Sequence, residues 1–148
     1  MPQVMSIDIV KELIKSYSVG HRRFIRGSKL AERYYENKND ILYGTRKSRE
    51  NDPLRNADNR MPRNFHGLLV NQKAAYMFSA PPLFDVGNDA VNKQIADMLG
   101  DKYAKVCKDL CIKASNCRVA WVHYWKDDTG NWKYGTIDPK QIIPVYST

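Results

Sequence analysis

The sequence lacks the motifs on which several common enzyme classes depend. It contains no glycine-rich phosphate-binding loop, no Gly-x-Ser-x-Gly nucleophile elbow, no His-Glu-x-x-His pair and no EF-hand pattern. Nucleotide hydrolysis and serine hydrolysis are therefore disfavoured. We expect a protein that is not an enzyme and that uses no cofactor or metal ion.

Long apolar runs are also missing. No stretch approaches the roughly 20 apolar residues of a membrane-spanning helix, and the N-terminus lacks the features of a secretory signal. We therefore expect a chain of cytoplasmic origin with no membrane partner, and its 148 residues suit one domain. Only three cysteines occur, at spacings that match no common zinc or redox motif, so we expect small buried side chains: Cys107, Cys111 and Cys117.

Acidic residues are few relative to basic ones. The chain has 24 Lys and Arg against 16 Asp and Glu, a formal net charge of +8. Residues 21–33 hold five cations against one carboxylate, and residues 45–63 hold six against three. Such clusters suit either a polyanion or the charges of a neighbouring subunit. The candidates for nucleic-acid or subunit contact, from charge clustering alone, are Arg22, Arg23, Arg26, Arg46, Lys47 and Arg49.

Catalytic residue types are scattered. The histidines fall in three different predicted elements, and we expect packed or hydrogen-bonded side chains: His21, His66 and His123. Asp127 and Asp128 occupy a predicted turn and Asp138 a bend, where turn chemistry alone places aspartate. A metal-dependent nuclease, which needs several converging carboxylates, is the least favoured class.

Apolar periodicity predicts mainly helix in the first 117 residues. A helix over 6–17 should end at Gly20, and a second should cover about 21–37. A third should run from near Pro62 to the Pro81-Pro82 pair, with one face formed by Phe65, Leu68, Leu69, Gln72, Ala75, Tyr76 and Ser79. Two more should follow, one capped by Asn88 or Asp89 and ending at Gly100, and one capped by Asp101.

The last 31 residues change to extended character. Residues 118–125 and 132–137 are rich in β-branched and aromatic side chains and flank a turn, which predicts a hairpin with a loop of three to five residues. Its aromatic side chains are better explained by cross-strand packing than by stacking on nucleic-acid bases. Residues 141–146 suggest a further strand. We therefore expect an α+β fold in which N-terminal amphipathic helices precede a small antiparallel sheet.

The expected organisation is a single segment with four parts. These are a helical arm (1–44), a basic loop (45–61), a helical region (62–117) and a β-rich region (118–148). The polar stretch 45–59 shows no apolar stripe, so we expect an exposed loop there. The sequence closes on an apolar strand-like stretch, whereas free termini are usually polar, and we expect the front portion of a longer protein.

Four stretches in this order and spacing resemble the N-terminal part of tailed-bacteriophage portal proteins, especially those of phages that infect Gram-positive bacteria. They are residues 34–42, 58–65, 68–78 with the following Pro81-Pro82, and 132–146. The resemblance implies a portal wing region, with the stem, clip and crown absent from the chain.

The resemblance also implies a function and partners. A portal subunit forms a ring, commonly of twelve copies, at one capsid vertex of the virion, and double-stranded DNA passes through it during packaging and ejection. The implied partners are other copies of the chain, the major capsid and scaffolding proteins, the terminase and head-completion or adaptor proteins, with assembly in the bacterial cytoplasm. The alternative is a free-standing basic nucleic-acid-binding or head–tail adaptor protein.

Overall fold

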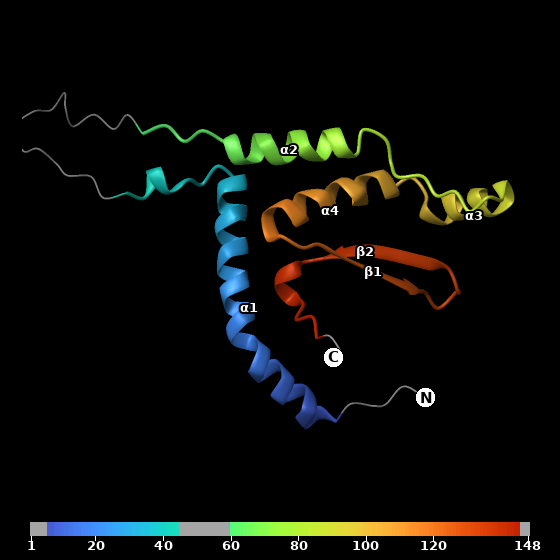
Figure 1. The fold of residues 1–148 in the computed structure, drawn as a ribbon, viewed down its shortest axis with the longest axis horizontal. Helices are drawn as coiled ribbons and strands as arrows, with labels where there is room; N and C mark the ends of the chain where they lie inside the picture. Colours follow the sequence, from blue (N-terminus) through green and yellow to red (C-terminus); the bar gives the residue numbers. More distant parts are fainter. Residues whose placement is uncertain (1–5, 45–59, 146–148) are drawn as a thin grey trace, which may run out of the picture.

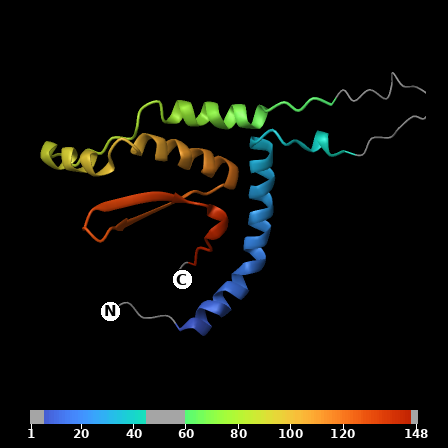
Figure 2. The ribbon, with the colours of Figure 1, turned by 180° about the vertical axis from the view of Figure 1, so that it is seen from behind.

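The computed structural model describes residues 6–44 and 60–145. In chain order these form α1 (Ile7–Tyr35), the 3-10 helix η1 (Asp40–Leu42), α2 (Phe65–Met77), α3 (Asp89–Leu99), α4 (Tyr103–Cys117), β1 (Trp121–Lys126), β2 (Trp132–Ile137) and the 3-10 helix η2 (Pro139–Gln141). Four helices and an antiparallel strand pair confirm the expected α+β class. α2, α4 and the hairpin extend in layers from one side of α1 with α3 at their far end, and the segment with η1 projects on the other side of α1 (Figures 1 and 2).

The N-terminal region is one long helix, so the prediction that Gly20 separates two helices was wrong. α1 runs without interruption for 29 residues, with Ser6 as its N-cap. Gly20 does not have a positive φ, so it does not adopt the left-handed conformation that ends many helices. A helical glycine costs only about 1 kcal/mol relative to alanine, which the other residues of a long helix offset.

Helix α2 begins three residues after Pro62. Its N-cap is Asn64, whose Oδ1 accepts a hydrogen bond from the Gly67 amide at 2.9 Å. The residues that α2 buries are Gly67, Val70 and Ala74. These small side chains allow close approach to α1 and α4, and the apolar face noted in the sequence lies on the exposed side of the helix.

Helices α3 and α4 follow the sequence signals closely. Asn88 caps α3 by accepting hydrogen bonds from the Ala90 and Val91 amides, and Gly100 ends it with φ of 62°. The prediction that Asp101 caps α4 was wrong, because the N-cap is Lys102 and no side chain caps that end. Its buried face contains all three cysteines, as expected, and all are free thiols: Cys107, Cys111 and Cys117.

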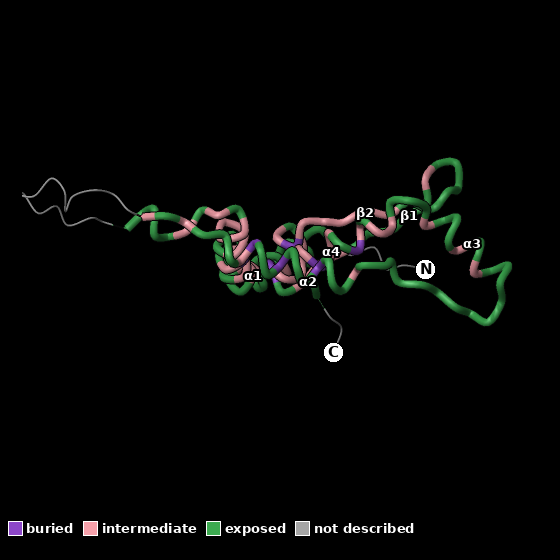
Figure 3. Tube along the Cα trace, turned by 90° about the horizontal axis from the view of Figure 1, so that it is seen from above, coloured by how far each residue is buried: buried purple, intermediate pink, exposed green. Residues whose placement is uncertain are grey.

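The core lies where α1, α2 and α4 meet (Figure 3). The apolar side chains buried within the described residues are all small or medium in size: Val70, Ala74, Cys107, Cys111, Cys117 and Pro139. The Tyr35 hydroxyl on α1 donates to Asn71 Oδ1 on α2 at 2.8 Å, which fastens the two helices beside this core. A core this small leaves many larger apolar side chains outside it.

The predicted hairpin is present. β1 and β2 pair antiparallel, with Tyr124 opposite Tyr134, and the five residues 127–131 connect them. Tyr124 and Trp132 contact each other across the strands with ring centroids 6.1 Å apart. Lys113 on α4 donates to Thr136 Oγ1 at 2.7 Å and anchors β2 to that helix.

The strand expected over residues 141–146 was wrong as far as the chain is described. Pro139 opens η2 instead, and Asp138 caps it by accepting from the Lys140 amide at 2.9 Å. Residues 142–145 then continue without regular structure and pack toward α1. The predicted loop at 45–59 lies outside the described residues.

Candidate functional site

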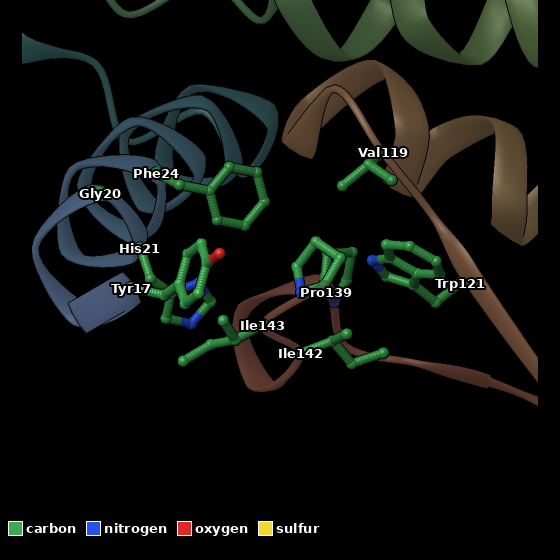
Figure 4. A pocket seen from close by; sticks show the side chains of 10 residues that line it. Tyr17, Gly20, His21, Phe24, Val119, Trp121, Pro139, Ile142 and Ile143 are labelled. Carbon is green, nitrogen blue, oxygen red and sulfur yellow. The ribbon is translucent and has the colours of Figure 1, made fainter. Parts of the chain in front are cut away.

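The C-terminal part of the described chain and α1 enclose an apolar groove, called here the α1 groove. Its volume is about 360 Å³. The side chains come from three places that are distant in sequence: the middle of α1, the start of β1, and η2 with the residues after it (Figure 4). They are Tyr17, Gly20, His21, Phe24, Val119, Trp121, Pro139, Ile142, Ile143 and Pro144. This lining suits an apolar contact and supplies no carboxylate, thiol or lysine for catalysis.

His21 has a structural role in the α1 groove. Its Nε2 lies 2.9 Å from the Lys140 carbonyl oxygen, and its ring stacks on Phe24 with centroids 5.9 Å apart. One ring nitrogen therefore donates to the backbone of η2. This contact ties η2 to α1 and fixes the shape of the groove.

An ion pair closes the same junction. Lys140 Nζ contacts Glu32 of α1 and also lies 3.1 Å from Asp138 Oδ1. Burial opposes the charge of Lys140, but its hydrogen bonds to Glu32 and Asp138 outweigh this and raise its pKa above the ordinary value. For Asp138, burial is likewise outweighed by the amide and ammonium of Lys140, and the pKa is lowered. Both shifts favour the charged, paired state.

The other two histidines also have neighbours that explain them. His66 Nε2 lies 2.8 Å from Asn116 Oδ1 and so links α2 to the end of α4. His123 stacks on Trp125 with centroids 5.2 Å apart. Neither histidine is brought near His21, so the fold assembles no histidine centre from them.

Asp127 organises the turn of the hairpin. Asp127 Oδ1 accepts from the Thr129 hydroxyl at 2.7 Å and from the Asn131 amide at 2.8 Å. The Thr129 hydroxyl is the main cause that lowers the pKa of Asp127. Across residues 6–44 and 60–145 no group of three or more His, Cys, Asp or Glu side chains could hold a metal ion.

The charge candidates fall into two sets. Arg22, Arg23 and Arg26 are exposed on α1, away from the α1 groove. The other three, Arg46, Lys47 and Arg49, lie outside the described residues.

The most unusual feature is apolar surface that nothing in the described chain covers. On α1 the stripe that lines the α1 groove continues toward the N-terminus as exposed Ile7, Val10 and Ile14. On α2 the exposed side carries Phe65, Leu68, Leu69 and Tyr76, with Leu69 64% and Tyr76 88% exposed. The apolar stripes are visible in the sequence, but their exposure depends on which side of each helix meets the core. Contiguous exposed apolar side chains are typical of surfaces that bind another protein.

None of the helices within the described ranges combines the length and the apolar character needed to cross a bilayer.

Comparison with known proteins gives a consistent result. Residues 14–148 match the family described as phage portal protein, SPP1 Gp6-like. The portal protein of Clostridium phage phiCD119 is 39% identical over 153 aligned positions, which cover 96% of this chain and 33% of that protein. The portal protein of Bacillus phage SPP1 is 24% identical over 89 positions, covering 60% of this chain and 18% of that protein.

The chain thus spans at most about a third of the length of these relatives. The family match covers all the described elements from Ile14 of α1 onward, including the exposed face of α2 and the α1 groove. The resemblance noted in the sequence is therefore confirmed, and the chain belongs to the SPP1 Gp6-like family of phage portal proteins.

Proposed function

We propose that this chain is a structural part of a portal subunit, which forms a ring at one capsid vertex through which double-stranded DNA is packaged and ejected. The observation that carries the proposal is the exposed apolar surface of α1 and α2 in a member of the portal family. The role is structural rather than catalytic, and the described residues assemble no catalytic constellation.

The energetics favour association of such a subunit. Complete burial of one Leu or Phe side chain contributes roughly 1.5–3 kcal/mol. The outer face of α2 alone presents four large apolar side chains: Phe65, Leu68, Leu69 and Tyr76. Covering them by other protein surface offsets a substantial part of the entropy lost on association.

The proposed assembly follows from the family. Twelve copies are the commonest ring, the subunit resides in the virion, and assembly takes place in the bacterial cytoplasm. The proposed partners are other copies of the chain, the major capsid and scaffolding proteins, the terminase, head-completion or adaptor proteins, and the DNA in the channel. We assign the described segment to the wing, comprising the helical arm (1–44), the basic loop (45–61), the helical region (62–117) and the β-rich region (118–148).

Complementation of a phage that lacks its own portal gene tests the proposal. The full-length gene should restore DNA-filled, infectious heads, and the L68S/L69S variant should yield few of them, because it makes the exposed face of α2 polar. A matched control is K73E, an exposed substitution on the same helix that leaves the apolar face intact. If the portal-deficient phage forms as many DNA-filled heads without the complementing gene as with it, the portal role is refuted.

The exposed cations of α1 favour one alternative, a free-standing basic module that binds nucleic acid or acts as a head–tail adaptor. Such a protein would be a monomer or dimer, and the affinity of a nucleic-acid-binding module for DNA would fall steeply with added salt.

A further inference from the structure

The outward side of α1 is a strongly basic surface. Residues 15–29 contain five cations and no carboxylate. Lys15, Arg22, Arg26 and Lys29 recur at steps of seven, four and three residues, which places them on one face of the helix. All four are exposed, and none forms an ion pair with the rest of the described chain.

This basic face contains a groove with an apolar floor, called here the basic groove. It is lined by Val19, Arg22, Ile25 and Arg26 and has a volume of about 430 Å³. Val19 is 67% exposed although it is β-branched and fully apolar. Two arginines that flank two apolar side chains form a surface suited to a ligand with both negative charge and apolar groups.

The opposite end of the subunit has the complementary chemistry. Residues 85–101, which include α3, contain four aspartates and one lysine. Asp89, Asp97 and Asp101 are exposed and form no ion pair within the described chain. Val91 and Met98 on α3 are 39% and 50% exposed, so the helix also offers apolar side chains.

The geometry of the subunit separates these two surfaces. α1 and α3 lie at opposite ends of the layers formed by α2, α4 and the hairpin (Figure 1). α3 buries none of its residues, so most of its surface is free for contact. One subunit therefore cannot bring its own α3 to its own basic groove, whereas two copies placed head to tail can.

We infer that α3 of one copy docks into the basic groove on α1 of the next copy. Arg22 and Arg26 face Asp97 and Asp101 at the C-terminal end of α3, and Val19 and Ile25 pack against Met98 and Val91, which share one face of that helix. The contact is heterologous, because each copy uses a different surface at each end, and repetition of such a contact closes a ring when the rotation permits. The inference rests on the proposed ring and names the surfaces that join its subunits.

The composition of the groove favours a second copy over DNA as the occupant. A phosphate backbone would satisfy the arginines but would leave Val19 and Ile25 facing polar groups and water. The C-terminal end of α3 satisfies both kinds of side chain, because exposed Met98 directly follows Asp97 and precedes Asp101 by three residues. Opposite charges across such a contact also set its register and exclude wrong pairings.

Charge reversal and charge exchange test the contact in the full-length protein. R22E/R26E and D97R/D101R should each weaken assembly at least about tenfold, measured by sedimentation as the concentration at half association. The quadruple variant R22E/R26E/D97R/D101R restores the opposite charges and should recover most of the lost assembly. K73E/K108E reverses two exposed lysines on α2 and α4 and should leave assembly unchanged.

Cysteine cross-linking gives a second, independent readout. V19C and M98C in one chain should form disulfides between copies under mild oxidation and yield a ladder of covalent oligomers, whereas either substitution alone should not. V19C combined with K108C, an exposed position on α4, is the control and should not form the ladder.

The outcomes separate the two proposals. A wild-type ring with no effect of charge reversal, no rescue and no V19C–M98C ladder overturns the α1–α3 contact and leaves the portal ring standing. Loss of DNA binding by R22E/R26E without loss of assembly overturns it in favour of DNA. A full-length wild-type protein that stays monomeric overturns both proposals.

Discussion

Two adjacent residues of α2 should respond to truncation in opposite ways. Val70 is 7% exposed and packs in the core, whereas Leu69 is 64% exposed on the outer face. V70A removes two buried methyl groups and leaves a small cavity, so it should lower the free energy of unfolding by about 2 kcal/mol. L69A removes a side chain that is mostly in water, so it should lower that free energy by less than about 1 kcal/mol.

Urea unfolding measures the difference, at subunit concentrations too low for assembly. For a protein of this size V70A should lower the midpoint by about 1 M urea, and L69A by much less. Assembly should show the reverse order, because L69A removes apolar contact area from the subunit interface and should weaken association roughly tenfold. If L69A lowers the urea midpoint as much as V70A and leaves assembly unchanged, the outer face of α2 belongs to the fold rather than to an interface.

Three further predictions follow from single features. K140M should lower the free energy of unfolding by about 1–3 kcal/mol at pH 7, because it leaves Glu32 unpaired. Since the folded-state pKa of Lys140 is raised, its stabilisation is complete below the unfolded pKa and is lost as pH rises through the folded value. The urea midpoints of the two proteins should therefore converge as the pH rises above the folded-state pKa of Lys140, which lies above the ordinary lysine value. G20A should stabilise α1 by about 0.5–1 kcal/mol, whereas G100A should destabilise the protein, because of these two glycines only Gly100 has a positive φ. Thermal unfolding measures the effect of both substitutions. Destabilisation by G20A would contradict a continuous α1. Charge reversal in the predicted basic loop should impair assembly or DNA retention without unfolding the core, and normal packaged heads would remove the reason for naming its residues: Arg46, Lys47 and Arg49.

Sequence reasoning succeeded where the signal is local. The cap at Asn88, the left-handed Gly100 and the turn after β1 depend on side chains within a few residues of one another. The hairpin was predictable for the same reason. Each of these features is encoded by turn and capping chemistry that a single short stretch contains.

Sequence reasoning failed where the answer depends on distant parts of the chain. Gly20 can end a helix or be tolerated inside one, and the choice depends on the packing of α1 against α4 and η2. The apolar stretch after Gln141 has strand composition, but it packs toward α1 instead of pairing with β2. On α2 the small residues Gly67, Val70 and Ala74 meet the core, and the larger apolar side chains remain outside.

The candidate surfaces also combine features that are visible in the sequence with features that depend on tertiary packing. Charge clustering located the exposed cations of α1, but the acidic character of α3 matters only because the fold places that helix at the far end of the layers that extend from α1. The outer face of α2 was visible as a stripe in the sequence. Its exposure follows from tertiary packing, which no local pattern encodes.

We propose an open subunit whose apolar faces are covered only when copies join. Native mass spectrometry of the full-length protein at micromolar concentration measures this association. The wild type should give one closed multiple of the subunit mass, and L68S/L69S should shift toward monomer. A wild-type protein that remains a stable monomer, with α2 exposed and no tendency to associate, would contradict it.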